Sequence, residues 1–246
     1  MGKDVALHLE TVLSCSGAGC PGVRDGHVVN NWKTGTPPRG ITIRPWKNSL
    51  ADVELVVIGQ NPGNADPFER ALNADHELVE HRAELLGRSL TGAMPYIDYW
   101  IEVDRLLNAL FTNGASRTLL AAEGYYCQHG SAEPHPEGVR RVLDHCSEQH
   151  LAKQLRAVKE AARQAPLIVG LGRHVREWWN RSAWRVEFRF VAAQHPSGNN
   201  PRWRELFSTE EPTTLSPLIV EAWTTFQTTS KTSIDLWRSR GGTYVP

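Results

Sequence analysis

Four short and mostly apolar runs, each followed by glycine or a polar cluster, constrain the fold of this chain most strongly. The runs span residues 54–59, 119–126, 167–172 and 188–193. Runs of this length bounded by turn residues are typical of buried β-strands. Because apolar residues follow one another instead of alternating with polar ones, we expect both faces of the sheet to be covered, as in a parallel sheet.

Three segments between or after these runs have the apolar spacing of helices, namely 96–111, 137–164 and 213–227. The second is long enough to form one helix or two. In the first segment we expect one apolar face, formed by Ile97, Trp100, Ile101, Leu107 and Leu110. Strands that alternate with helices predict the α/β class, here a three-layer α/β/α sandwich around a central, mostly parallel sheet of four strands.

The composition is that of a globular domain, with 246 residues, of which 40% are hydrophobic and 22% are charged. We expect a single domain over residues 1–246, present as a monomer, with a loosely held tail from about residue 231 to 246. No apolar run approaches the roughly 18 residues of a membrane span, and the N-terminus lacks the apolar core of a signal peptide. We therefore expect a cytoplasmic protein that does not bind membranes.

Charge is balanced over the whole chain, with 27 basic and 27 acidic residues, but it is unevenly distributed. Residues 166–206 hold seven arginines and three glutamates, whereas residues 66–104 hold nine acidic residues and three arginines. The overall balance therefore does not exclude a local surface that binds phosphates.

Three loops follow the predicted strands, where parallel sheets bind their ligands. The first is Gly59-Gln60-Asn61-Pro62-Gly63 and the last is His195-Pro196-Ser197-Gly198-Asn199-Asn200, while the third strand ends in Gly170-Leu171-Gly172-Arg173. Each loop alone is also typical of a simple turn. Their order along the chain is more specific than any one of them.

Together these loops resemble the two motifs of the uracil-DNA glycosylase superfamily. The segment 59–63 resembles the Asn-Pro-Gly form of its first motif, and His195-Pro196-Ser197 resembles the uracil-specific form of its second. The resemblance covers residues 15–204. It implies a monofunctional DNA glycosylase, which flips uracil or another deaminated base out of DNA and hydrolyses its N-glycosidic bond in base excision repair.

The resemblance implies catalytic roles for Asn61 and His195. The amide of Asn61 would hold the attacking water, although it cannot remove its proton. His195 would donate to a carbonyl oxygen of the departing base, and one such donor is typically worth about 10² to 10³ in rate. The implied pocket residues are Gly59, Gln60, Pro62, Gly63, Leu90 and Glu123.

Contacts with DNA are expected from small polar residues, which allow close approach to phosphates, and from arginines, which neutralise them. The expected residues are Ser197, Gly198, Asn199, Arg173, Arg202 and Arg204. Trp203, between two of these arginines, belongs either to this surface or to the core.

Two positions depart from the pattern of the superfamily. Glu123 stands where the iron–sulfur branches have an asparagine that reads the base. An ionised carboxylate would accept a hydrogen bond from N3–H of uracil but would repel the O4 carbonyl oxygen. A protonated carboxyl group would offer both a donor and an acceptor. Leu90 stands where an aromatic ring stacks on the base, and Tyr96 and Tyr125 are candidates to replace it. The base therefore stays open between uracil, hypoxanthine and xanthine. The alternative function is a lesion- or abasic-site-binding protein with little or no turnover.

The chain has four cysteines, Cys15, Cys20, Cys127 and Cys146. Their order resembles that of the iron–sulfur branches of the superfamily, and four thiolates are what a [4Fe–4S] cluster requires. The implied cluster would be structural, fastening the N-terminal segment to the sheet, and the chemistry needs no cofactor. There are two alternatives to the cluster. One is a zinc site that includes His129 and His145, as in an unrelated α/β enzyme. The other is that the cysteines are buried thiols without metal.

Overall fold

A computed structural model describes residues 12, 15–26, 28–29, 42–45, 48–60, 98–124, 128–129, 136–196 and 200–236. Within these residues one sheet has six strands in the order β2-β4-β3-β6-β7-β8. Strand β2 is antiparallel to β4, and the other neighbours are parallel. The expected α/β sandwich with a mostly parallel sheet is confirmed, with two more strands than predicted.

The strands of this sheet are short. They are β2 (Thr42–Arg44), β3 (Leu55–Gly59), β4 (Leu119–Glu123), β6 (Leu167–Leu171), β7 (Phe190–Ala193) and β8 (Ser233–Asp235). A second, two-stranded sheet pairs β1 (Val28–Val29) with β5 (Gln128–His129).

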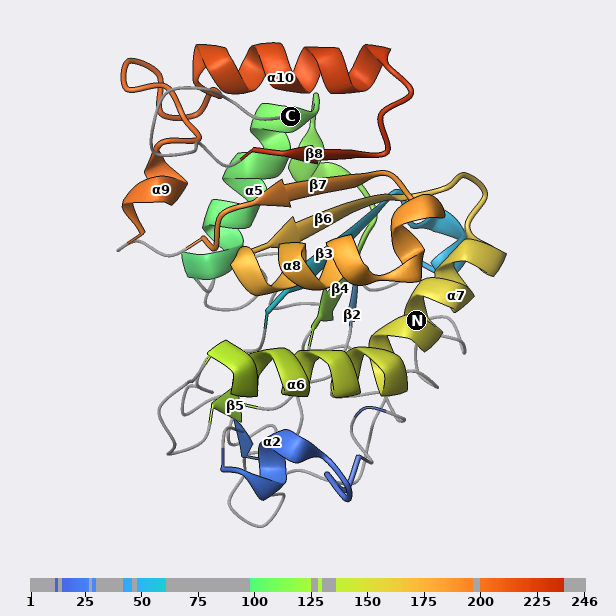
Figure 1. Cartoon of the computed structure of the whole chain (residues 1–246). Helices are drawn as coiled ribbons and strands as arrows, with labels where there is room; N and C mark the ends of the chain where they lie inside the picture. Colours follow the sequence, from blue (N-terminus) through green and yellow to red (C-terminus); the bar gives the residue numbers. More distant parts are fainter. Residues whose placement is uncertain are drawn as a thin grey trace.

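Helices occupy both faces of the larger sheet (Figure 1). They are α2 (Pro21–Arg24), α5 (Asp98–Leu110), α6 (Pro136–Cys146), α7 (Ala152–Ala161), α8 (Arg173–Arg181), α9 (Pro201–Arg204) and α10 (Pro217–Thr228). A π-helical turn, Ser147–Leu151, joins α6 to α7, and short 3-10 turns span Leu50–Asp52, Gly114–Ser116 and Ala183–Val186. No helix in the described part of the chain has both the length and the apolar character needed to cross a membrane.

Alternate residues of each strand belong to two separate hydrophobic clusters. In β3, Val56 and Ile58 face α6, α7 and α8, whereas Leu55 and Val57 face α5, α9 and α10. Since side chains alternate along a strand, a sheet covered on both faces needs apolar residues at every position. This is why the strands appear in the sequence as continuous apolar runs.

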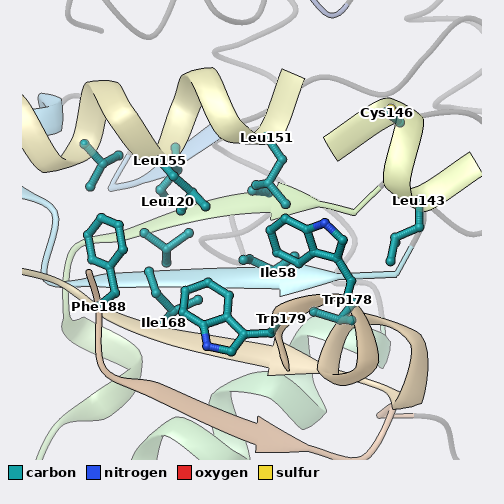
Figure 2. Close-up of a cluster of buried hydrophobic side chains, with 14 of the residues drawn as sticks. Ile58, Leu120, Leu143, Cys146, Leu151, Leu155, Ile168, Trp178, Trp179 and Phe188 are labelled. Carbon is teal, nitrogen blue, oxygen red and sulfur yellow. The ribbon is translucent and has the colours of Figure 1, made fainter. Parts of the chain in front are cut away.

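The first cluster shows how the helices close over the sheet (Figure 2). Leu151 and Leu155 lie on one side of Ile58, and Trp179 lies on the other. Trp179 is fully buried and stacks on Phe190, with ring centroids 4.5 Å apart. The segment predicted as one or two helices is thus two α-helices, α6 and α7, joined by the π-helical turn.

Several elements were not expected from the sequence, among them β2, β8 and α8. The edge strands β2 and β8 have three residues each, with one buried apolar residue apiece, Ile43 and Ile234, so they form no apolar run. Helix α8 is mostly polar and buries a single stripe on the sheet. The prediction of a loosely held tail from residue 231 is wrong for β8 and for the buried Leu236, because β8 pairs with β7.

The N-terminal segment packs against α6 at one end of the molecule. Helix α2 contacts α6, and β1 pairs antiparallel with β5. A Cβ at Gly22 would overlap side-chain atoms of Val142 on α6 and Val28 on β1. Glycine at this position therefore permits the close approach of α2 to α6.

His150, in the π-helical turn, gives folding a pH dependence. Burial lowers the pKa of His150 to about 4, and the positive charges of Lys153 and His145 act in the same direction. In the unfolded chain its pKa is about 6.5, so the unfolded state binds the additional proton first. We predict that the free energy of unfolding falls as pH decreases from about 6.5 to about 4.

The variant His150→Gln should lose part of this pH dependence because glutamine does not titrate. Urea denaturation of both proteins at about pH 7.5 and about pH 5 measures the difference. An equal loss of stability in the two proteins would contradict the assignment to His150.

Candidate active site

The carboxyl ends of four parallel strands bring the predicted loops to one edge of the sheet. Gly59, the last residue of β3, pairs with Glu123, the last residue of β4. On the other side of β3 lies β6, whose Leu171 pairs with Ala193 at the end of β7. The chain continues from β3 to β4 on one side and later returns to β6 on the other, which makes this edge a topological switch point and the expected place for a ligand.

Glu123 lies over Gly59. Strand alternation places Glu123 on the same face as Leu119 and Ala121, which pack under α5. A Cβ built on Gly59 would overlap the carboxylate of Glu123, so the missing side chain of this glycine is what leaves room for it. Glu123 is itself partly exposed, and its Oε2 is shielded from solvent.

Tyr99 links the two ends of this edge. Helix α5 begins here, close to the ends of β6 and β7 (Figure 1), and Tyr99 is in its first turn. The Tyr99 hydroxyl lies 3.1 Å from the Cβ position of Gly59, and the Tyr99 ring centroid lies 5.5 Å from that of His195. One side chain therefore contacts both the Glu123 and the His195 sides of the site.

His195 follows β7 and is partly buried. A Cβ on Gly172 would lie 3.6 Å from the Cβ of His195, and Gly172 has a φ of +95°, which favours glycine. Burial lowers the pKa of His195 below its usual value of 6.5. The ring is therefore neutral at pH 7, with one nitrogen donating and the other accepting.

Asn200 fixes the loop that carries His195. Its side-chain amide donates to the backbone carbonyl of His195 at 3.0 Å. Its side-chain oxygen accepts from the backbone N–H of Arg202 at 3.1 Å and so caps the N-terminus of α9. Both ends of the 195–200 loop are thus held by one residue.

Helix α9 presents arginines next to a buried tryptophan. Arg202 and Arg204, which the sequence analysis predicted to bind phosphates, are exposed. Trp203 is 1% exposed, and its Nε1 donates to Glu102 on α5 at 2.6 Å. Trp203 therefore belongs to the core, and it fastens α9 to the helix that carries Tyr99.

Three other arginines of the basic segment have partners on different elements. Arg173 pairs with Glu177 at 2.6 Å, Arg181 pairs with Asp144, and Arg189 stacks on Phe226. Arg173 thus pairs with one carboxylate, stays 67% exposed and remains a predicted contact to DNA.

Several predicted residues lie outside the described residues. They are Asn61, Pro62, Gly63, Leu90, Ser197, Gly198, Asn199 and Cys127. Of the predicted pocket, the structure brings together Gly59, Glu123 and His195, and it shows Gln60 directly after β3.

Tyr99 is a site residue to which the sequence analysis gave no role, whereas Asn200 was expected only as part of the His195 loop. The buried stripe of α5 is Val103, Leu106, Leu107 and Leu110, and Ile101, expected on this stripe, is 48% exposed. Tyr99 lies one helical turn before Val103 and so belongs to the same stripe. Assigning the buried face of this helix correctly would have identified Tyr99 from the sequence.

Cys20 and Cys146 lie where α2 meets α6, in the same buried cluster. Cys20 is the N-cap of α2 and Cys146 is the last residue of α6. Cys127 precedes β5, which pairs with β1 just after α2. Among the described residues no three His, Cys, Asp or Glu side chains are grouped closely enough to hold a metal.

The described cavities lie away from this edge. One, of about 480 Å³, is at the amino ends of β6 and β7, where Leu167, Phe188 and Arg189 line it together with Trp223. The guanidinium of Arg189 lies over the ring of Phe226, and none of the predicted site residues lines this cavity.

No protein-family model and no curated protein matches this chain. The arrangement of Gly59, Tyr99, Glu123 and His195 therefore carries the functional argument.

We predict that Asn200→Ala lowers the free energy of unfolding by about 1–2 kcal/mol, because it removes a helix cap and a hydrogen bond to a partly buried carbonyl. Asn200→Asp keeps the acceptor for the Arg202 N–H but cannot donate to His195, so it isolates the second bond. Chemical denaturation of both variants measures these losses. Wild-type stability in Asn200→Ala would show that the loop is held by other contacts.

Proposed function

We propose that this protein is a DNA glycosylase that hydrolyses the N-glycosidic bond of uracil or another deaminated base. The observation that carries the proposal is that the residues beginning the two motif loops, Gln60 and His195, lie at one edge of the sheet. Gln60, which precedes Asn61, and His195 follow strands separated only by β6, a spacing of about 10 Å. Tyr99 touches both sides of this gap.

His195 has the properties needed to stabilise the departing base. The base leaves with negative charge on its carbonyl oxygens, and a neutral imidazole N–H can donate to one of them. A partly buried donor is effective because little water competes for the developing charge. The direction of the His195 pKa shift, toward the neutral form at pH 7, supports this role.

Asn61 would act on the other side of the scissile bond. The resemblance gives it the attacking water, which its side-chain oxygen can hold without removing a proton. Water placement and stabilisation of the leaving base would then supply most of the rate enhancement.

The substrate would reach this edge as a nucleotide turned out of the DNA stack. Arg202 and Arg204 on α9 lie at the exposed end of the His195 loop, where they can neutralise phosphates. Because Asn200 and Trp203 fasten α9 to His195 and to α5, phosphate binding and the base pocket share one rigid support.

We propose that the four cysteines hold a structural [4Fe–4S] cluster, as the resemblance implies, although the described Cys15, Cys20 and Cys146 do not by themselves form a group that could hold a metal. Cys20 and Cys146 belong to one buried cluster, and α2, which follows Cys20, packs on α6, which ends at Cys146. Cys15 and Cys127 would complete the set. The cluster would stabilise this end and take no part in the chemistry at His195, and zinc is the alternative occupant.

A second candidate function is binding of lesions or abasic sites without turnover. Glu123 favours it, because an ionised carboxylate beside the pocket repels a departing anionic base. Tight binding of abasic DNA together with no excision of any base would establish this alternative.

We predict that the protein releases uracil from an oligonucleotide, leaving an abasic site that alkali converts to a strand break. His195→Ala should lower the single-turnover rate by about 10² to 10³. His174→Ala on α8 is a matched control and should retain the wild-type rate. Absence of strand breaks on uracil, hypoxanthine and xanthine substrates, single- and double-stranded, would end the enzyme proposal.

We also predict that the purified protein carries about four irons per chain and absorbs broadly at about 400 nm. Cys146→Ala should lose both signals, while Ser16→Ala, beside Cys15, should keep them. Equimolar zinc with no iron would instead assign a zinc site to the cysteines.

A further inference from the structure

Two polar groups of opposite hydrogen-bonding character lie over the same glycine. The carboxylate of Glu123 occupies the space that a side chain at Gly59 would take, and the hydroxyl of Tyr99 lies 3.1 Å from the same Cβ position. They come from different elements, β4 and α5, and both residues are partly exposed. A ligand at this edge therefore meets both groups side by side.

The pair offers one acceptor and one donor. An ionised carboxylate only accepts hydrogen bonds, whereas a tyrosine hydroxyl can donate one. A side-chain amide presents the same two functions on neighbouring atoms. Glu123 and Tyr99 together can thus supply the acceptor and the donor that a single amide side chain supplies.

The matching group on a nucleobase is an N–H next to a carbonyl. Uracil, hypoxanthine and xanthine all have this lactam edge, because deamination replaces an amino group by a carbonyl and places hydrogen on the adjacent ring nitrogen. Cytosine and adenine have the reverse pattern, an unprotonated ring nitrogen next to an amino group. The hydroxyl can turn to accept from an amino group, but the carboxylate cannot donate to a bare ring nitrogen.

We propose that Tyr99 is a specificity-determining residue that, together with Glu123, selects bases with a lactam edge over cytosine and adenine. Glu123 accepts from the ring N–H, and the Tyr99 hydroxyl donates to the neighbouring carbonyl. This inference rests on the proposed function, since it places a nucleobase at this edge. Thymine and guanine share the lactam edge, so other walls of the site must exclude them.

The pair also makes a prediction about Glu123→Gln. Glutamine carries acceptor and donor on one side chain, so it can read the lactam edge without help from Tyr99. The loss caused by Tyr99→Phe should therefore depend on the residue at position 123, and such dependence is what a double-mutant cycle measures.

The experiment measures binding to two single-stranded oligonucleotides that differ in one nucleotide, 2′-fluoro-2′-deoxyuridine or 2′-fluoro-2′-deoxycytidine. The fluorine opposes positive charge on the sugar, so neither base is excised. We expect the wild type to prefer the uracil probe by at least about 10-fold, as for a well-formed pair of hydrogen bonds to a base edge. Tyr99→Phe should reduce this preference by about 5-fold or more, but by less than about 2-fold when Glu123→Gln is also present.

Ile101→Ala, an exposed change on the same helix, is the control and should leave the preference unchanged. An unchanged preference in Tyr99→Phe overturns the inference. So does an equal loss of preference with glutamate and with glutamine at position 123, because Tyr99 would then act only by packing on His195. Equal binding of the two probes by the wild type also overturns it.

Failure of the inference and failure of the proposed function give different results. If the protein excises uracil but Tyr99→Phe keeps the wild-type preference, the glycosylase proposal stands and the role of Tyr99 is wrong. If the predicted preferences are found but no base is excised, Tyr99 and Glu123 do recognise the lactam edge of the base. The protein is then a binding protein and not a glycosylase.

Discussion

The parallel pairing of β4, β3, β6 and β7 is the constraint on which the candidate site depends. Parallel strands in register end at the same edge, so residues far apart in sequence must meet there. Gly59, Glu123 and His195 come from three such strand ends. A shift of one residue in any pairing would turn the polar group at that end to the opposite face and remove it from α5.

The central part of the fold could be predicted because it is encoded locally. Four strands buried on both faces appear as continuous apolar runs, and the three predicted helical segments, which correspond to α5, α6, α7 and α10, show apolar stripes. The edge strands β2 and β8 could not be found this way, since Ile43 and Ile234 are isolated apolar residues whose strands exist only through pairing with a neighbour. Helix α8 was within reach, because Val175, Trp178 and Trp179 have helical spacing.

The site was predictable where it depends on strand ends and not where it depends on packing between elements. His195 follows an apolar run and Glu123 lies near the end of another, so their common edge follows from the sheet. Tyr99 joins them from α5, and its contacts depend on the phase of that helix over the sheet. Asn200 resembles an ordinary turn residue in sequence, and only the folded loop shows that it serves two backbone groups at once.

The two hydrogen bonds of Asn200 have a mechanical consequence. One side chain holds the start of α9 and the backbone of His195, so α9 cannot move as a unit without breaking a bond or displacing the imidazole. A displacement of α9 would therefore strain the hydrogen bond that holds the backbone of His195.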